Sequence, residues 1–317
     1  MAEMFRSSGV EVIVPATSAN LGPGFDCMGL ALALHDHLVA MVTDDPGVLV
    51  HVEGEGSAFL PKDDRHLVAR AMLRALEAME VAAPGVVLRC DNAIPQSRGL
   101  GSSAAAIVGG ILLARALVVD GDDRLPEEAV LDLATSLEGH PDNVAAVMLG
   151  GFTTAWIETP GSADVHARAV TRPVHADVMP VALIPPAGMS TASARRMLPE
   201  SVLREDAVFN VGRAALLTHA MTLDPSMMMP ATEDRLHQDA RAHAYPDSHG
   251  LVIALRQRGV PTVISGAGPS VLALADEDSV ALVVESAPAG WRAVVVEPDS
   301  MGARVHVRGR QDSPWPG

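Results

Sequence analysis

The segment 95–106 constrains this chain more than any other, because it joins an expected strand to an expected helix through a glycine-rich loop. It reads Pro-Gln-Ser-Arg-Gly-Leu-Gly-Ser-Ser-Ala-Ala-Ala and follows the apolar run 86–88. Glycines allow several backbone N–H groups to point toward one ligand, because they have no Cβ atom that would clash. A helix N-terminus adds unpaired N–H donors and the positive end of the helix dipole. A phosphate group suits such a loop. The alternative is an ordinary turn in which Ser102 or Ser103 caps the helix.

Lysine occurs once in the 317-residue chain, at Lys62, beside no glycine-rich segment. A Walker A loop needs lysine directly after its last glycine, where this loop has Ser102, and protein kinases need a lysine on a strand. The dinucleotide-binding pattern also fails, because the glycine pairs at 22–24 and 99–101 lack a third glycine at the required offset. A bound phosphate would therefore need peptide N–H groups, serine hydroxyls, a metal ion and arginines.

Length, charge and cysteine content indicate the number of domains, the partners that are unsuitable and the cellular compartment. A chain of 317 residues favours two domains that share a cleft. Its net charge of −16 argues against nucleic acid and anionic membrane surfaces as partners. The two cysteines, Cys27 and Cys90, offer no zinc or disulfide framework, and no segment reads as a secretion signal or a membrane span. We therefore expect a soluble, cytoplasmic protein.

Hydrophobic periodicity predicts an α+β fold without regular βαβα alternation. Strands are expected over 10–14, 38–42, 48–52, 86–90, 177–186 and within 261–275. Helices are expected over 65–81, 102–119, 127–137, 202–222 and 247–258. Prolines and glycines interrupt the pattern between 158 and 173, so we predict an N-terminal domain over 1–160 and a C-terminal domain over 161–317.

A second glycine-containing segment, 15–26, is expected as a polar loop after the first strand. It reads Pro-Ala-Thr-Ser-Ala-Asn-Leu-Gly-Pro-Gly-Phe-Asp. Polar residues held at a strand end can orient a small ligand, with Asn20 as donor and acceptor and Asp26 as the partner of a cationic amine. Alternatively, these side chains bond their own backbone in a local turn.

The segment 138–143 reads Glu-Gly-His-Pro-Asp-Asn and concentrates two carboxylates, an imidazole and an amide just past an expected helix. Carboxylate oxygens together with a serine hydroxyl suit Mg²⁺, which prefers hard oxygen ligands. His140 could bind a carboxylate, and Asp142 could orient a hydroxyl or accept its proton. A lone histidine is usually structural, so it is the density of the cluster that indicates a site.

A third glycine-rich segment, 264–272, reads Ile-Ser-Gly-Ala-Gly-Pro-Ser-Val-Leu and leads from a strand into a turn. Gly266 and Gly268 would let the backbone approach another group closely. That group is either a ligand or the segment 95–106, and the sequence leaves both open.

These three segments, in this order and at these spacings, resemble the GHMP small-molecule kinase family, named for galacto-, homoserine, mevalonate and phosphomevalonate kinases. The resemblance covers residues 12 to about 275. Members of this family have a phosphate loop without lysine, as in Pro95-x-x-x-Gly-Leu-Gly-Ser-Ser-Ala104. The resemblance implies an N-terminal domain similar to domain 2 of ribosomal protein S5, a ferredoxin-like C-terminal domain, and ATP and substrate in the cleft between them.

The glycine-containing segment 15–26 and the polar segment 138–143 resemble the homoserine kinase branch of that family. The other branches usually carry Ser-Gly-x-Asp at the position where this chain has His140-Pro-Asp142. The resemblance implies an L-homoserine pocket made of Asn20, Asp26, His140, Asn143, Thr191, Arg195 and Arg241. In it, Asp26 suits the amino group and the arginines suit the carboxylate. The aromatic residue common before the last arginine is replaced by Ala240.

For the nucleotide, the resemblance implies that the β and γ phosphates of ATP bind the loop Pro95, Gln96, Ser97, Arg98, Gly99, Leu100, Gly101, Ser102, Ser103 and Ala104. Ser103 and Glu138 would hold Mg²⁺. Arg98 would touch the nucleotide or point to solvent. The catalytic residues expected from the resemblance are Asp142, Asn143, Ser103 and Glu138.

The expected function is thus ATP-dependent phosphorylation of the L-homoserine hydroxyl in threonine biosynthesis, with a homodimer left open. One alternative is a kinase of another small alcohol, such as mevalonate or a sugar. Another is a nucleotide-binding sensor that keeps the fold without turnover, although the intact Ser103, Glu138 and Asp142 speak against it.

Overall fold

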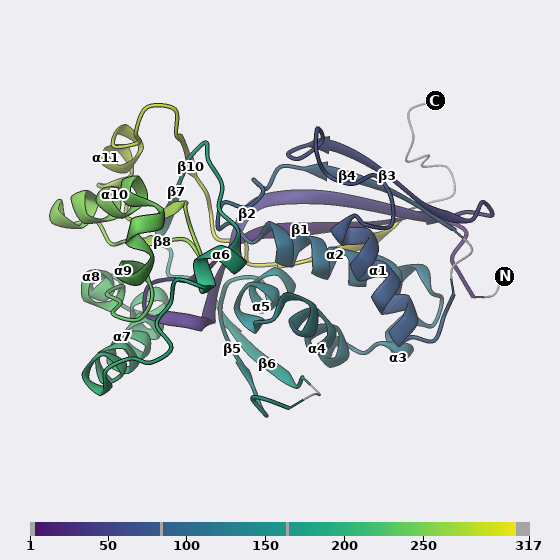
Figure 1. Cartoon of the computed structure of the whole chain (residues 1–317), viewed down its shortest axis with the longest axis horizontal. Coiled ribbons are helices and arrows are strands. Elements are labelled where there is room, and N and C mark those ends of the chain that lie inside the picture. Colours follow the sequence, from purple (N-terminus) through teal and green to yellow (C-terminus); the bar gives the residue numbers. More distant parts are fainter. Residues whose placement is uncertain (1–3, 83–84, 163–164, 309–317) are drawn as a thin grey trace.

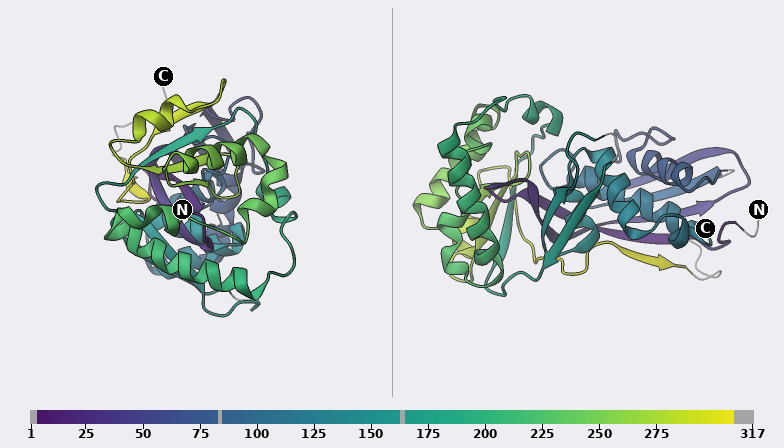
Figure 2. Two further views of the ribbon diagram at one scale, coloured as in Figure 1. Left: turned by 90° about the vertical axis from the view of Figure 1, so that its left-hand side faces the viewer. Right: turned by 90° about the horizontal axis from the view of Figure 1, so that it is seen from below.

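The computed structural model describes residues 4–82, 85–162 and 165–308, which form two lobes, each built on one β-sheet (Figure 1). The larger lobe contains the N-terminal half of the chain and the smaller lobe most of the remainder. Seen from below, the lobes lie end to end, and the first strands reach from one into the other (Figure 2). None of the helices in these ranges is long and apolar enough to span a lipid bilayer.

The larger lobe contains a seven-stranded sheet with the order β11-β1-β2-β4-β3, extended by β5 on β2 and by β6 on β5. Only β3 and β4 pair in parallel. The sheet comprises β1 (Val10–Asn20), β2 (Gly24–Val42), β3 (Gly47–Gly54), β4 (Gly85–Asn92), β5 (Phe152–Ile157), β6 (Ala167–Arg172) and β11 (Arg304–Val307).

Helices cover one face of this sheet (Figure 1). They are α1 (Leu67–Ala78), α2 (Ser102–Leu117), α3 (Gly121–Arg124), α4 (Glu127–Glu138) and α5 (Pro141–Leu149). The Ala-rich α2 is buried on almost every side, as expected of a helix that is apolar all round. Two glycines make this possible, because a Cβ on Gly110 would meet the Val68 carbonyl of α1 and one on Gly109 would meet Leu38 of β2. The start of α2 is therefore rigidly placed.

The smaller lobe contains a four-stranded antiparallel sheet with the order β10-β7-β9-β8. Its chain order, β7, helices, β8, β9, α11, β10, is the βαββαβ pattern of a ferredoxin-like fold, which confirms the expected C-terminal architecture. The elements are β7 (Met179–Ile184), α6 (Thr191–Arg195), α7 (Arg204–Thr222), η1 (Pro225–Met227), α8 (Met228–Ala231), α9 (Gln238–Arg241), η2 (Ala242–Ala244), α10 (Pro246–Gln257), β8 (Thr262–Ile264), β9 (Val271–Ala275), α11 (Val280–Glu285) and β10 (Arg292–Val295).

The segment 15–26 differs from the expected polar loop. The strand expected over 10–14 continues to Asn20, and the one expected over 38–42 is the end of the 19-residue β2, so a tight turn over 21–23 joins two paired strands. Thr17 and Ser18 are fully buried within β1. Their polarity suggested a loop, whereas internal hydrogen bonds satisfy it.

Sheet membership changes after Arg172, inside the interruption expected between 158 and 173. The predicted boundary at 160 falls between β5 and β6, which pair over their whole length in the larger sheet. Near the other end of the chain, β11 returns to pair with β1. The division into two domains remains a proposal, and the sheets assign 165–172 and 304–307 to the first of them.

Candidate active site

The three glycine-rich segments meet between the lobes. The Ser265 hydroxyl lies 2.6 Å from the Gly99 carbonyl oxygen and 2.8 Å from the Ser18 hydroxyl oxygen. The Gly266 N–H donates to the Ala19 carbonyl at 3.0 Å. A Cβ on Gly99 would collide with the Ser265 carbonyl. The third segment therefore packs against the phosphate loop, as one of the two alternatives predicted, and Gly266 also lines the cavity described below.

The phosphate loop leads into α2 without a capping side chain. Gly99 and Gly101 have φ angles of 73° and 70°, in the left-handed region that glycine tolerates. Gly101 is the N-cap residue of α2, and no side chain caps it, so the alternative in which Ser102 or Ser103 caps the helix is wrong. The N–H groups of the first turn thus have no side-chain acceptor at the cap, as an anion-binding helix start requires.

A cavity of about 270 Å³ opens beside this loop. Fifteen of the predicted site residues line it: Asn20, Asp26, Gln96, Ser97, Arg98, Gly99, Gly101, Ser102, Ser103, Glu138, His140, Asp142, Asn143, Arg195 and Arg241. Three residues of the phosphate loop, Pro95, Leu100 and Ala104, are buried in the protein and do not line the cavity. The side chain of Thr191 lies outside the described part of the chain. Lining residues that the sequence reasoning missed are Phe25, Leu67, Ser190 and Ala267.

One wall of the cavity is acidic. The Ser103 hydroxyl donates to a Glu138 carboxylate oxygen at 2.7 Å, which brings the end of α4 to the start of α2. Gly139 ends α4 with a φ of 94°, and α5 begins directly after His140. Burial raises the pKa of Glu138, although the hydrogen bond from Ser103 opposes that shift. A cation placed here would lower that pKa again.

His140 and Asp142 form a buried pair beside Glu138, with His140 Nδ1 2.5 Å from Asp142 Oδ1. Burial lowers the pKa of His140, but the hydrogen bond to Asp142 and the negative charge of Asp142 outweigh burial, so the pKa is raised overall. The Asn143 N–H donates to the same carboxylate oxygen at 2.8 Å, and the Asn143 side chain accepts from Thr17. Asp142 is thus held rigidly at the start of α5.

The cavity is also lined by two arginines from the smaller lobe, Arg195 and Arg241. Arg195 of α6 pairs with Asp26 through both of its terminal nitrogens, with Nη1 donating to Asp26 Oδ2 at 3.0 Å and Nη2 donating to Asp26 Oδ1. Arg241 of α9 is only 1% exposed, and its Nη2 has no hydrogen-bond partner within the described residues. The Phe25 ring contacts both guanidinium groups, at 5.7 Å and 5.6 Å from its centroid. The cavity is thus lined by three carboxylates, those of Asp26, Glu138 and Asp142. It also has a cation paired with Asp26, Arg195, and a buried cation that no carboxylate pairs with among the described residues, Arg241.

Arg98 lines the cavity and is held by backbone carbonyl groups. Its guanidinium donates to the carbonyl oxygens of Gln96, Pro185 and Pro186, and contact with a nucleotide stays a prediction. The side chain ties the phosphate loop to the linker that leads to α6. Two of its three partners are backbone atoms nearly ninety residues away, which no local pattern indicates.

The side-chain amide of Asn20 acts as donor and acceptor within the protein. It donates to the Gly266 carbonyl at 2.8 Å and accepts from the Asp26 N–H at 3.0 Å, so part of the predicted local turn is present. Asn20 and Asp26 have positive φ angles, 67° and 57°, and such strain is common at functional sites. Both residues line the cavity, and their contact with a substrate stays a prediction.

The chain matches known kinases over its length. Residues 66–151 match the family pattern described as GHMP kinases N terminal domain. The chain is 51% identical to a homoserine kinase of Streptomyces avermitilis, over 95% of this chain and 97% of the relative. It is 48% identical to a homoserine kinase of Clavibacter michiganensis subsp. michiganensis, over 94% of each chain.

Solved structures show the same relationship. A crystal structure of homoserine kinase from Cytophaga hutchinsonii superposes with a TM-score of 0.78 and 25% identity, over 94% of this chain and 98% of the other. A mevalonate diphosphate decarboxylase from Enterococcus faecalis shares the fold, with a TM-score of 0.63 at 12% identity. Taken with the lysine-free phosphate loop and the cavity beside it, these similarities show that the chain belongs to the homoserine kinases of the GHMP kinase family.

Proposed function

We propose that this protein transfers the γ-phosphoryl group of ATP to the side-chain hydroxyl of L-homoserine, giving ADP and O-phospho-L-homoserine for threonine biosynthesis in the cytoplasm. The observation that carries the proposal is the unpaired, buried guanidinium of Arg241 in a cavity that also contains a carboxylate and the phosphate loop. A buried cation without an anion is unfavourable, so the cavity is suited to a ligand that brings a carboxylate.

The charges of the cavity match a zwitterionic amino acid. Arg241 and Arg195 would bind the carboxylate of L-homoserine, because a guanidinium fork matches two carboxylate oxygens. Asp26 would bind the ammonium group and would exchange Arg195 for it as the substrate enters. Asn20 would act through the backbone that it holds, while His140, Asn143 and Thr191 would contact the rest of the substrate.

ATP use follows from membership of the kinase family. The loop Pro95–Ala104 would bind the β and γ phosphates through peptide N–H groups, with the uncapped start of α2 supplying three of them and the positive end of its dipole. Within this loop, Pro95, Leu100, Ala104 and Arg98 would hold its shape, because their side chains pack behind it or bond to backbone. No lysine is required, since the peptide groups and a metal ion share the charge.

The residues present fit a magnesium ion. Ser103 and Glu138 place a hydroxyl and a carboxylate 2.7 Å apart at the edge of the phosphate loop, and both are hard oxygen donors. When bound there, Mg²⁺ would neutralise charge on the phosphate oxygens. The group Asp26, His140 and Asp142 also places three ligand atoms within 4.8 Å of one another, but Asp26 and Asp142 have substrate roles in this proposal.

Catalysis would come mainly from alignment and electrostatics, because phosphoryl transfer has a loose transition state that needs little help from a base. Asp142 would accept a hydrogen bond from the substrate hydroxyl, direct its oxygen at the γ-phosphorus, and receive the proton as the new O–P bond forms. Asn143 would hold Asp142 at its position through the backbone bond described above.

An assay of ADP release with ATP, Mg²⁺ and one alcohol at a time tests this function. We expect turnover with L-homoserine and little with mevalonate or galactose, because only the amino acid supplies both charges that the cavity lacks. Turnover with mevalonate but not L-homoserine would indicate a kinase of another alcohol. ATP binding without turnover on any alcohol would indicate a nucleotide sensor.

A further inference from the structure

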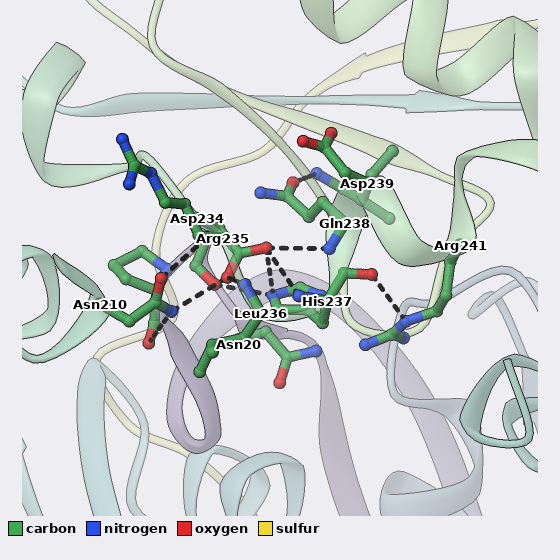
Figure 3. Close-up of polar contacts among 12 residues, drawn as sticks. Asn20, Asn210, Asp234, Arg235, Leu236, His237, Gln238, Asp239 and Arg241 are labelled. Carbon is green, nitrogen blue, oxygen red and sulfur yellow. Dashed lines mark hydrogen bonds and ion pairs between the residues drawn. The ribbon is translucent and has the colours of Figure 1, made fainter. Parts of the chain in front are cut away.

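We propose that Asp234 and His237, which have no contact with the cavity, are positioning residues for both charged ends of the L-homoserine site. The inference rests on the proposed function, since it assigns Arg241 to the carboxylate and Asp26 to the ammonium group. Figure 3 shows the arrangement, with the Asp234 carboxylate surrounded by donors from the segment that leads into α9. We call Asn210, Asp234 and His237 the buried hub.

The Asp234 carboxylate is completely buried and fully hydrogen-bonded. One oxygen accepts from the Leu236 N–H at 2.9 Å and from the Asn210 amide at 3.0 Å. The other accepts from the N–H groups of His237 and Gln238, at 3.0 Å and 2.8 Å. Burial opposes ionisation, yet these hydrogen-bond donors favour it, and the pKa of Asp234 is lowered overall. A single carboxylate thus fixes three consecutive peptide groups.

From the hub, one path leads to Arg241. The three fixed peptide groups lead into α9, which begins at Gln238, is only one turn long and ends at Arg241. The His237 carbonyl accepts from Arg241 Nε at 3.2 Å, and the Gln238 side chain accepts from the Ile264 N–H at 2.7 Å, anchoring the turn to β8. Because so short a helix has little stability of its own, the direction of the Arg241 side chain depends on these contacts.

A second path leads to Asp26. His237 Nε2 lies 2.7 Å from the Gly22 carbonyl oxygen, and the Asn210 amide donates to the Pro23 carbonyl at 3.4 Å. Both carbonyls belong to the turn between β1 and β2, which comes from the other lobe and leads directly into Asp26. The turn packs closely against the smaller lobe, because a Cβ on Gly22 would collide with the Thr232 carbonyl.

The protonation state of His237 follows from its surroundings. A carbonyl oxygen only accepts hydrogen bonds, so Nε2 carries the proton, and Nδ1 has no partner among the described residues. Burial lowers the pKa of His237, which keeps the ring neutral. A charged ring would repel Arg241. The buried hub therefore sets the spacing between the two opposite charges that would hold the substrate.

Steady-state kinetics of Asp234→Asn test the inference. The amide keeps the shape but turns an N–H toward peptide donors, so we expect the KM for L-homoserine to rise about ten- to hundredfold, with the KM for ATP changed less than about threefold. Asp239→Asn is the matched control, because Asp239 lies in the same segment with its side chain 82% exposed and should leave both constants unchanged. Equal changes in both KM values would overturn the inference, since they indicate a general loss of structure.

If Asp234→Asn does not fold, two His237 variants test whether the buried hub positions the L-homoserine site. His237→Gln can place an amide donor near the position of Nε2 and should keep the KM for L-homoserine within about threefold of wild type, whereas His237→Ala should raise it about tenfold. If both variants behave alike, the contact with Gly22 does not position the site. If wild-type protein does not phosphorylate L-homoserine, the proposed function fails; if it does and the variants match it, only the positioning role fails.

Discussion

Arg241 shows how a single residue can be unfavourable for the free protein and useful for binding. Its guanidinium is almost completely buried, one of its nitrogens lacks a partner, and no carboxylate pairs with it in the described part of the chain. Burial lowers its pKa, which reflects the free energy spent in removing the cation from water. Arg195, by contrast, already pairs with Asp26. The substrate carboxylate would therefore gain most of its binding free energy at Arg241.

We predict that Arg241→Met makes the protein more stable and a poorer enzyme. Removing an unpaired buried charge while keeping the volume should raise the free energy of unfolding by about 1–3 kcal/mol. The KM for L-homoserine should rise at least about a hundredfold, because a charge-assisted fork is lost. Urea unfolding and steady-state kinetics measure the two effects.

Arg256→Met is the control for this prediction. Arg256 is also partly buried, but it donates to the Thr232 hydroxyl and to the Met229 and Thr262 carbonyls. Its loss should lower stability and leave the KM for L-homoserine near wild type. A destabilised Arg241→Met variant would show that the guanidinium has partners that the structure does not reveal.

At the scale of elements, the phosphate loop depends on backbone shape rather than on charged side chains. The loop is enclosed between β1 and the turn after β8, since the Thr17 N–H donates to the Leu100 carbonyl and the Ser270 N–H donates to the Arg98 carbonyl. Gly99 lies where these segments approach most closely. Its missing side chain is thus needed for two reasons, the positive φ and the lack of space.

We predict that Gly99→Ala destabilises the protein by about 3 kcal/mol and raises the KM for ATP at least about tenfold, because strain adds to a collision with the Ser265 carbonyl. Gly259→Ala is the control. Gly259 has a similar φ of 84° but open space around its Cβ position, so only strain of about 1 kcal/mol is expected and the KM for ATP should not change. Thermal unfolding and kinetics compare the variants, and equal destabilisation would mean that packing at Gly99 is unimportant.

Much of this architecture could be predicted from the sequence, since the expected helices coincide with α1, α2, α4, α7 and α10. The apolar residues of α1 and α4 recur at helical spacing, and α2 is a long apolar run after a glycine-rich loop. The strand nature of 15–20 could not, since Thr17 and Ser18 are polar and find their partners only in the folded chain. The helix α5 was missed because Pro141 reads as a helix stop, whereas it occupies the first helical position, where proline is tolerated.

Part of the candidate site could also be predicted from the sequence, and part could not. Residues within the glycine-rich motifs could be found from local patterns, and most of them line the cavity. Arg98 bonds to carbonyl groups of a distant segment, and Asp234 is joined to the distant side chain of Asn210, so the sequence offers no local signal for these contacts.

At the scale of the molecule, the chain closes the larger lobe with residues that follow the smaller one. Asp299 is 5% exposed and accepts from the N–H groups of Met301 and Gly302, at 2.7 Å and 2.8 Å, and it pairs with His35 of β2. These contacts direct the chain into β11, which pairs with β1. Burial opposes ionisation of Asp299, but the bond with His35 and the peptide donors lower its pKa.

We predict that Asp299→Asn lowers the free energy of unfolding by about 2–3 kcal/mol at pH 7. Because the folded-state pKa of Asp299 lies below its ordinary value of 3.8, the ionised group stabilises the protein above that value, and this contribution is lost as the pH falls through the folded-state pKa. The difference between variant and wild type should therefore shrink from pH 7 to pH 3 in urea unfolding. Asp278→Asn, at an exposed position, should show no difference at either pH.

The turn between β1 and β2 has a consequence for how such enzymes can diversify. Its carbonyl groups accept hydrogen bonds from His237 and Asn210, which follow it by more than 180 residues. A chimaera that joined the first half of this protein to the second half of a distant relative would separate those partners, and the ammonium and carboxylate ends of the pocket would no longer match in spacing. With Asp26 and Arg241 as the proposed substrate ligands, both halves of the chain would determine substrate choice together, and recombination at the linker would not transfer it.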